Sequence, residues 1–171
     1  MNNLKFVVAS DLHGSMLALE RLLDIVTEKR ADRLILLGDV FGTNASEMVK
    51  KLNTIAYKVV CVKGNNDWYF EPDGADFEIF SQTYYNINGN IAYLSHGHKL
   101  NWFNMDDYGA KIIMFGHYHY PILKRDKNLI LLCPGSIAFP RNGSGKSYAY
   151  IEGDLIQICS IENRTLLELK I

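Results

Sequence analysis

Every histidine in the chain follows directly after a short apolar segment, and several aspartates and asparagines do the same. These residues are Asp11, His13, Asp39, Asn65, Asn66, Asp67, His96, His98, His117 and His119. Imidazole, carboxylate and carboxamide groups, in a set without a thiolate, are suitable ligands for Mn, Fe, Zn or Ni. They are too numerous for one tetrahedral site, so they favour two ions with open positions and a shared carboxylate. Such a pair, about 3.5–4 Å apart, can hold a phosphoryl group and supply a hydroxide for in-line attack.

A histidine or aspartate at a strand end is, taken singly, more often an ordinary polar residue or a helix cap than a ligand. The histidines differ because all five occur in this one context. The carboxyl ends of strands border the crevice where open α/β sheets bind ligands, so these groups should converge if their strands share a sheet. Within Asp11/His13 and His117/His119, a spacing of two places both side chains on one side of an extended segment. Neighbouring glycines allow unusual backbone angles: Gly14, Gly38, Gly64, Gly97 and Gly116.

The elements that must position these groups alternate between strands and helices in the first 65 residues. Apolar runs at 4–9, 34–37 and 58–62 predict strands. Apolar residues recur at helical spacing from Met16 to Val26, with Ser15 as N-cap, and a second helix is predicted over 46–53. The order β-α-β-α-β predicts a parallel sheet with crossover helices.

The pattern changes from about residue 82, where short runs of β-branched and aromatic residues alternate with turn-forming residues. Segments 147–151 and 155–159, joined by Glu152-Gly153-Asp154, predict a β-hairpin. The whole pattern predicts a mixed α/β domain, which a second and largely antiparallel set of strands completes.

Composition excludes several classes of protein. The length of 171 residues favours one domain, and a net charge of −1 gives no indication of membrane or specific nucleic-acid binding. We expect no signal peptide or membrane-spanning helix, because no apolar run is long enough. The three cysteines lie in apolar runs, which predicts buried, reduced thiols and a cytoplasmic location.

The ordered motifs Asp11-x-His13, Gly38-Asp39, Gly64-Asn65-x-Asp67, His96-Gly97-His98 and Gly116-His117-x-His119 resemble those of the calcineurin-like metallophosphoesterase superfamily. Within it, the chain is similar over nearly its full length to small phosphodiesterases of the YfcE type. This similarity includes residues 11–15, the turn at 134–136 and the late hairpins. The resemblance implies a single domain over residues 1–171, folded as a four-layer α/β/β/α sandwich with two mixed sheets.

The resemblance also implies a set of metal ligands, position by position. One ion would be held by Asp11, His13, Asp39 and His119. The other would be held by Asn65, His96, His117 and the bridging Asp39. Mn is the expected metal, and Fe, Zn or Ni are alternatives. The implied reaction is hydrolysis of a small phosphodiester by a hydroxide that both ions activate, with Asn65 stabilising charge on phosphoryl oxygens. Residues that bind the rest of the substrate are not assigned.

One position departs from the common superfamily pattern. Many members have a histidine that helps to protonate the leaving group where this chain has Asn66. A carboxamide cannot act as a general acid at neutral pH. The YfcE-type group also lacks this histidine, so the departure does not imply an inactive enzyme. His98 is a candidate alternative donor, and a supporting role next to the metal ligands is the other interpretation.

Two other activities fit the same resemblance. Hydrolysis of a phosphomonoester on a small metabolite is one alternative. A non-catalytic scaffold is the other, because a eukaryotic retromer coat subunit resembles this fold and has lost part of the ligand set. All seven ligand positions are filled here, which favours an enzyme.

Two further segments invite a functional interpretation. Residues 142–147, NGSGKS, resemble a phosphate-binding loop, but a strand rather than a helix is predicted to follow them. The segment 68–85 is rich in aromatic residues, which suits ordinary packing better than a substrate lid or a subunit interface. The resemblance allows a homo-oligomer without fixing its size.

Overall fold

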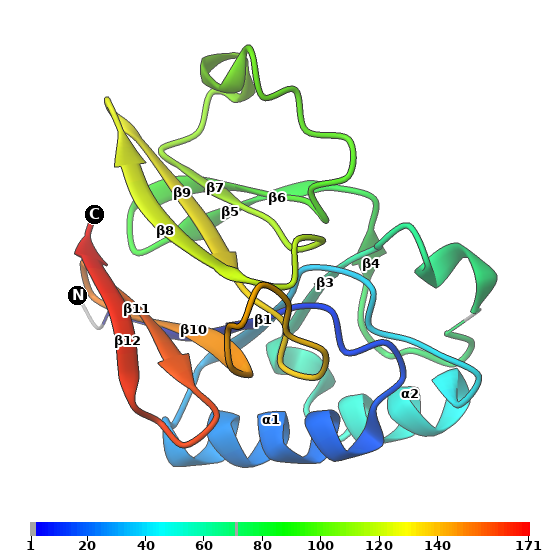
Figure 1. Cartoon of the computed structure of the whole chain (residues 1–171). Coiled ribbons are helices and arrows are strands. Elements are labelled where there is room, and N and C mark those ends of the chain that lie inside the picture. The colour runs from blue at the N-terminus through cyan, green and yellow to red at the C-terminus, as the bar shows by residue number, and fades with distance from the viewer. Residues whose placement is uncertain (1–2, 71) are drawn as a thin grey trace.

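The computed structural model describes residues 3–70 and 72–171, which form two mixed β-sheets and two α-helices (Figure 1). The strands of the first sheet are β1 (Lys5–Ala9), β2 (Arg33–Leu36), β3 (Val59–Val62), β4 (Ile79–Phe80), β10 (Ser147–Glu152), β11 (Leu155–Ser160) and β12 (Thr165–Lys170). The strands of the second sheet are β5 (Thr83–Ile87), β6 (Asn90–Leu94), β7 (Ile112–Met114), β8 (Pro121–Asp126) and β9 (Leu129–Pro134). Their orders are β12-β11-β10-β1-β2-β3-β4 and β5-β6-β7-β9-β8. Residues 1, 2 and 71 of the predicted domain lie outside the described residues.

The two α-helices lie in the part of the chain that the sequence assigned to crossovers. They are α1 (Met16–Glu28) and α2 (Ala45–Asn53). The short 3₁₀ helices are η1 (Ala56–Lys58), η2 (Asp67–Tyr69) and η3 (Met105–Tyr108). The predicted cap of α1 is confirmed, because the Ser15 hydroxyl accepts a hydrogen bond from the Ala18 amide at 3.2 Å. Strands β1, β2 and β3 are parallel, as predicted.

The central strands of the first sheet are buried on both faces. In β1, Val7 and Ala9 belong to the core beneath the two α-helices, whereas Phe6 and Val8 belong to the core between the sheets. Successive side chains of a strand point to opposite faces, so one short strand contributes to both cores. This explains why the central strands are continuous apolar runs rather than alternating ones.

The outer face of the second sheet is covered by residues 97–111, the loop at the top of Figure 1, whose helical part is η3. The rings of Tyr93 and Tyr108 stack there with centroids 4.5 Å apart. Trp102 meets the edge of Phe115 at 5.2 Å. The predicted α/β/β/α layering with two mixed sheets is therefore confirmed, and this loop forms the layer outside the second sheet.

The structure decides two points about the sheets that the sequence left open. The five strands that precede the polar residues do not share one sheet, because β1, β2 and β3 lie in the first and β6 and β7 in the second. The late hairpin β10–β11 exists as predicted, but it joins the first sheet, where β10 pairs antiparallel with β1. This pairing covers the edge of β1, which β2 leaves open, so the hairpin completes the sheet that begins the chain.

The three cysteines, Cys61, Cys133 and Cys159, are free and buried, as predicted. Among the described residues, no helix has the length and apolar character that crossing a membrane requires.

Packing of α1 on the first sheet can be tested with two leucines of the same helix. Leu19 is fully buried and Leu17 is 72% exposed. We expect Leu19→Ala to lower the free energy of unfolding by roughly 2–5 kcal/mol, because it leaves a cavity beneath the helix. Leu17→Ala is the matched control, with an expected change within about 0.5 kcal/mol. Urea unfolding measures both, and equal losses for the two variants would contradict the packing described.

Candidate metal centre

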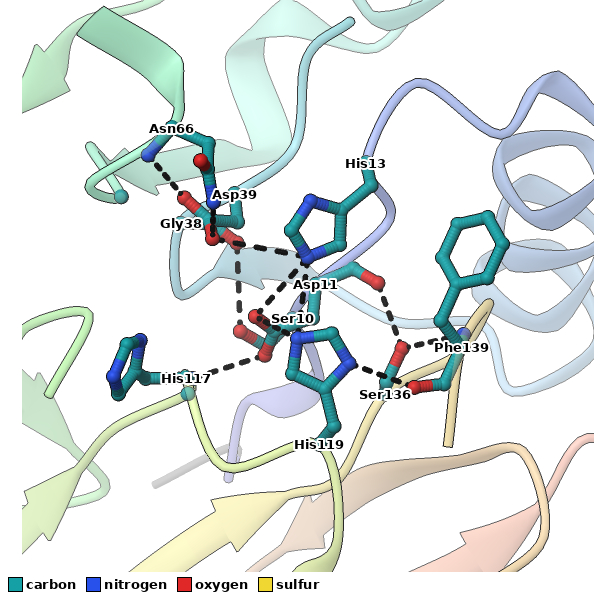
Figure 2. Close-up of polar contacts among 12 residues, drawn as sticks. Ser10, Asp11, His13, Gly38, Asp39, Asn66, His117, His119, Ser136 and Phe139 are labelled. Carbon is teal, nitrogen blue, oxygen red and sulfur yellow. Dashed lines mark hydrogen bonds and ion pairs between the residues drawn. The ribbon is translucent and has the colours of Figure 1, made fainter. Parts of the chain in front are cut away.

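The predicted ligands lie where the two sheets meet. Asp11 and Asp39 follow β1 and β2 of the first sheet, whereas His96 and the pair His117/His119 follow β6 and β7 of the second. Figure 2 shows Asp11 between His13 and His119, with Asp39 and Asn66 on one side of it. The site therefore draws its side chains from both sheets.

The backbone at these strand ends is left-handed rather than extended. Asp11, His13, Asp39, His117 and His119 have φ angles of 57°, 46°, 50°, 71° and 63°. The extended geometry assumed from the spacing of two is therefore wrong. Non-glycine residues rarely adopt this conformation, and each costs on the order of 1–3 kcal/mol, so the surrounding contacts must hold it in place.

Hydrogen bonds between neighbouring strand ends hold this backbone. The amides of Asp11 and His13 donate to the carbonyls of Gly38 and Asp39 at 3.1 and 2.8 Å. The loop after β1 therefore continues to pair with the loop after β2 beyond the regular sheet, and this pairing brings the two aspartates together.

One group of candidate ligands consists of Asp11, His13 and His119. His119 Nε2 lies 3.2 Å from Asp11 Oδ1 and 3.2 Å from His13 Nε2, and His13 Nε2 lies 3.8 Å from Asp11 Oδ1. Ligand nitrogens and oxygens lie roughly 2.0–2.2 Å from an ion such as Zn²⁺, so two ligands of one ion are about 3–4 Å apart. The spacing of these three atoms suits one shared ion.

A second group consists of Asp11, Asp39 and His96. His96 Nε2 lies 3.3 Å from Asp39 Oδ2 and 4.0 Å from Asp11 Oδ1. Asp39 Oδ2 is also 3.7 Å from His13 Nε2, so this carboxylate lies between the two groups. Its position suits the bridging role expected of Asp39.

Two of the histidines are oriented by backbone carbonyls. His96 Nδ1 lies 2.8 Å from the Leu37 carbonyl oxygen, and His119 Nδ1 lies 2.7 Å from that of Phe139. A carbonyl oxygen only accepts, so the proton of the neutral ring is assigned to Nδ1. The lone pair of Nε2 then faces the cluster, which is the usual arrangement of a metal-ligating histidine.

Several buried atoms of the cluster have no hydrogen-bond partner among the described residues. They include Asp11 Oδ1, Asn65 Oδ1 and His96 Nε2. A buried polar atom without a partner costs about 1–3 kcal/mol, so such atoms are uncommon in folded proteins. Cations held by the two groups would satisfy Asp11 Oδ1 and His96 Nε2, and the donor set therefore fits divalent ions.

The electrostatics of the cluster couple carboxylates to imidazoles. The close contact with the Asp11 carboxylate raises the pKa of His119. Burial opposes the charged form of His96, but its contacts with Asp39 and Asp11 outweigh burial and raise its pKa. Burial also opposes ionisation of Asp39, yet its contacts with His96 and Asn66 lower its pKa. Burial lowers the pKa of His13.

His117 and His98 lie next to these groups without joining them. The His117 amide donates to Asp11 Oδ2 at 3.0 Å, and its ring centroid is 5.2 Å from that of His96. The His98 ring is 5.5 Å from that of His96. Burial lowers the pKa of His98.

Sequence reasoning missed the structural roles of Asn66 and Asp67. Asn66 donates to both oxygens of Asp39, from its amide at 2.8 Å and from its side chain at 2.7 Å. Asp67 accepts from the amides of Phe41 and Gly64 at 2.9 and 2.8 Å, and so connects the loops after β2 and β3. The run Gly64-Asn-Asn-Asp67 suggested polar contacts, but its spacing alone could not assign their partners.

Ser136 and Phe139 also support the site without having been predicted. The Ser136 hydroxyl donates to the Asp11 carbonyl at 2.7 Å and accepts from the Phe139 amide at 2.8 Å. These bonds place the Phe139 carbonyl against His119, and the Phe139 ring is 6.0 Å from that of His13. The turn after β9 therefore orients a candidate ligand from outside the cluster.

A substitution at Gly64 can test how closely the loop after β3 approaches the loop after β2. A Cβ at this position would lie 2.1 Å from Asp39 Oδ1 and 2.2 Å from the Asp39 amide nitrogen. We expect Gly64→Ala to displace Asp39 and weaken binding of Mn²⁺ or Zn²⁺ by about tenfold or more. Gly145→Ala is the matched control, because nothing lies within 4 Å of its added Cβ. Calorimetric titration of metal into each variant measures the effect, and unchanged affinity in Gly64→Ala would contradict the geometry.

Metal affinity should also depend on pH. In the metal-free chain, raised pKa values of His96 and His119 stabilise the fold below their unfolded pKa, and this contribution is lost as pH rises through the folded pKa. An ion must displace those protons, so we expect Zn²⁺ to bind more tightly at about pH 7.5 than at about pH 5.5. His119→Gln should flatten this dependence in calorimetric titrations. Equal affinity at both pH values would show that these imidazoles do not bind the ion.

Comparison with known proteins agrees with this geometry. The family model described as "Calcineurin-like phosphoesterase superfamily domain" matches residues 4–154. The chain is 26% identical to the phosphodiesterase YfcE of Escherichia coli over 178 aligned residues, which cover 96% of each chain. It is 32% identical over 136 residues to a probable metallophosphoesterase of Methanocaldococcus jannaschii, covering 78% of this chain and 68% of the relative.

Solved structures give the same result. The structure of E. coli YfcE superposes with a TM-score of 0.86 at 27% identity, over 98% of this chain and 99% of that one. Vacuolar protein sorting 29 of Cryptosporidium parvum superposes with a TM-score of 0.75 at 16% identity, over the full length of both chains, and so shares the fold. The match of the family model over most of the chain, together with these relatives, shows that the chain belongs to the calcineurin-like phosphoesterase superfamily.

Proposed function

We propose that this protein is a phosphodiesterase that hydrolyses small phosphodiesters at a dinuclear metal centre. The observation that carries the proposal is the pair of three-residue groups that share Asp11 and adjoin through Asp39. Similarity to E. coli phosphodiesterase YfcE over 96% of both chains supports the diester as substrate. Manganese is the expected metal, with iron, zinc or nickel as alternatives.

In this proposal, one ion is held by Asp11, His13, Asp39 and His119. The second is held by Asp39, Asn65, His96 and His117. When bound, the pair of ions lowers the pKa of a water molecule and neutralises charge on the phosphoryl group. Asn65 supports this assignment because its buried Oδ1 has no partner in the described chain. Its amide group can donate to a phosphoryl oxygen once Oδ1 faces the cation.

Protonation of the leaving group is the step for which this chain has no obvious donor. Asn66 donates to both oxygens of Asp39, and a carboxamide carries no acidic proton at neutral pH. His98 is the candidate donor, although its pKa is lowered by burial and by His96. Good leaving groups, such as phenolates, should therefore be cleaved far better than simple alcohols.

The completeness of the ligand set distinguishes this proposal from its alternatives. A scaffold of the same fold does not need buried, unpartnered ligand atoms, whereas an enzyme that binds ions does. A phosphomonoesterase needs the same ions, so substrate preference alone separates it from a diesterase. We also propose a single domain over residues 1–171 in the cytoplasm; a homo-oligomer is compatible with this function.

The decisive experiment compares bis-p-nitrophenyl phosphate with p-nitrophenyl phosphate, using metal-stripped protein before and after addition of Mn²⁺. We expect Mn²⁺-dependent cleavage of the diester, with little cleavage of the monoester. Asp39→Asn should lower kcat/KM for the diester by at least about a hundredfold, because bound ions contribute several kcal/mol to the rate. Asp126→Asn, an exposed aspartate of the edge strand β8, is the matched control.

Each outcome of this experiment separates the possible functions. Comparable or faster monoester cleavage would replace the proposal with a phosphatase. Hydrolysis of neither substrate by protein with metal bound would favour a scaffold or a narrow specificity. Failure of the protein to bind any of the four metals would refute the site itself.

A further inference from the structure

A second pocket lies directly beside the candidate metal centre and shares His96 with it. It holds about 480 Å³ of space, including its open mouth, and forms between the turn that follows β4, the end of β6 and residues 97–100. Its lining includes Lys63, Trp68, Gln82, Ser95, His98 and Lys99. A phosphoryl group at the metal centre would therefore have one of its ester groups next to this pocket.

Two residues that line the pocket have buried polar atoms without a hydrogen-bond partner in the described chain, and a third offers a free donor. Ser95 is 8% exposed, and its Oγ is buried without a hydrogen-bond partner among the described residues. Nδ1 of His98 is also buried and has no hydrogen-bond partner among the described residues. Gln82 accepts from the Tyr93 hydroxyl at 2.9 Å through Oε1, which turns the donor end of its amide away from that bond. The Gln82 amide nitrogen can therefore donate to a ligand in the pocket that accepts hydrogen bonds.

The charge of the pocket is positive. Lys63 and Lys99 supply it, and the part of the lining that the structure describes contains neither aspartate nor glutamate. Lys63 Nζ lies 4.1 Å from the centroid of the Trp68 ring, so the ammonium group is held at one wall of the pocket. The Trp68 ring is 59% exposed, which leaves apolar surface for a ring or chain of a ligand.

We infer that this pocket binds a second anionic group, a phosphate or a carboxylate, on an alcohol portion of the phosphodiester. The two lysines and the Gln82 amide group recognise the anion, and Trp68 covers the carbon skeleton that connects it to the reacting phosphorus. The substrate class is therefore a phosphodiester with an additional anion on one ester group. This inference rests on the proposed diesterase function, and its tests separate the two.

The first test measures binding without catalysis. The chain has two tryptophans, so Trp102→Phe leaves Trp68 as the only one. In this background, full-length protein freed of metal is titrated with inorganic phosphate, and Trp68 fluorescence is followed. We expect saturable binding that Lys63→Met and Lys99→Met each weaken by about tenfold. Lys124→Met, on the edge strand β8 at the far side of the second sheet, is the matched control and should leave binding unchanged.

The second test compares two diesters of similar size in the Mn²⁺-loaded enzyme: 4-carboxyphenyl p-nitrophenyl phosphate and bis-p-nitrophenyl phosphate. Total consumption of each diester gives kcat/KM. We expect the carboxylate to be preferred, and Lys63→Met to lower this preference about tenfold relative to Lys124→Met.

The two tests have separable outcomes. Phosphate binding that is absent, or that the pocket and control variants weaken equally, overturns the inference and leaves the diesterase intact. Equal kcat/KM for the two diesters does the same. Lysine-dependent phosphate binding in a protein that cleaves neither diester supports the anion pocket and counts against the proposed function, because a scaffold or a narrow specificity then fits better.

Discussion

The burial of two carboxylates at the junction of the sheets is the constraint on which the rest of the site depends. Asp11 is fully buried and Asp39 is 2% exposed. Removing a carboxylate from water is costly unless donors or cations replace the lost hydration. Backbone amides supply part of this replacement, from Asn66 to Asp39 and from His117 to Asp11. The loops after β3 and β7 therefore fold around the carboxylates, and the histidines that follow are carried to the same place.

This constraint also accounts for the unusual backbone. A loop that turns sharply at a strand end can present both an amide and a side chain to one carboxylate only if it leaves the extended conformation. His117 does so, with a φ of 71°. Its amide bonds to Asp11 while its ring lies beside His96. Hydrogen bonds to the buried carboxylates offset this conformational cost, because they are stronger than hydrogen bonds between neutral groups.

Much of the fold could be predicted from the sequence because local patterns determine it. The apolar run before Asp11 and the helical spacing after Ser15 correspond to β1 and α1 within a residue or two. The membership of the sheets could not be predicted in the same way, since pairing between β10 and β1 joins segments about 140 residues apart in the chain, and sequence periodicity carries no information about such pairing.

The candidate site was predictable in composition but not in geometry. Five of the seven residues predicted as ligands, Asp11, His13, Asp39, His96 and His119, form two adjoining groups, because their motif order and residue types restrict the possible chemistry. The roles of Asn65 and His117 as ligands stay predictions. The contacts of Asn66, Ser136 and Phe139 were not predictable, since a side chain that supports a ligand through the backbone can be of many types. The left-handed angles were missed because a spacing of two residues describes strands and not the turns that end them.

The origin of the cluster in both sheets has a mechanical consequence. Asp11 and Asp39 follow strands of one sheet, and His96 and His119 follow strands of the other, so ions held among them would connect the two sheets. Partial unfolding that separates the layers would dismantle the cluster even where each sheet stays intact. Dissociation of the ions and separation of the two sheets would then occur together. The stability of the sandwich therefore depends on the same few atoms as its chemistry.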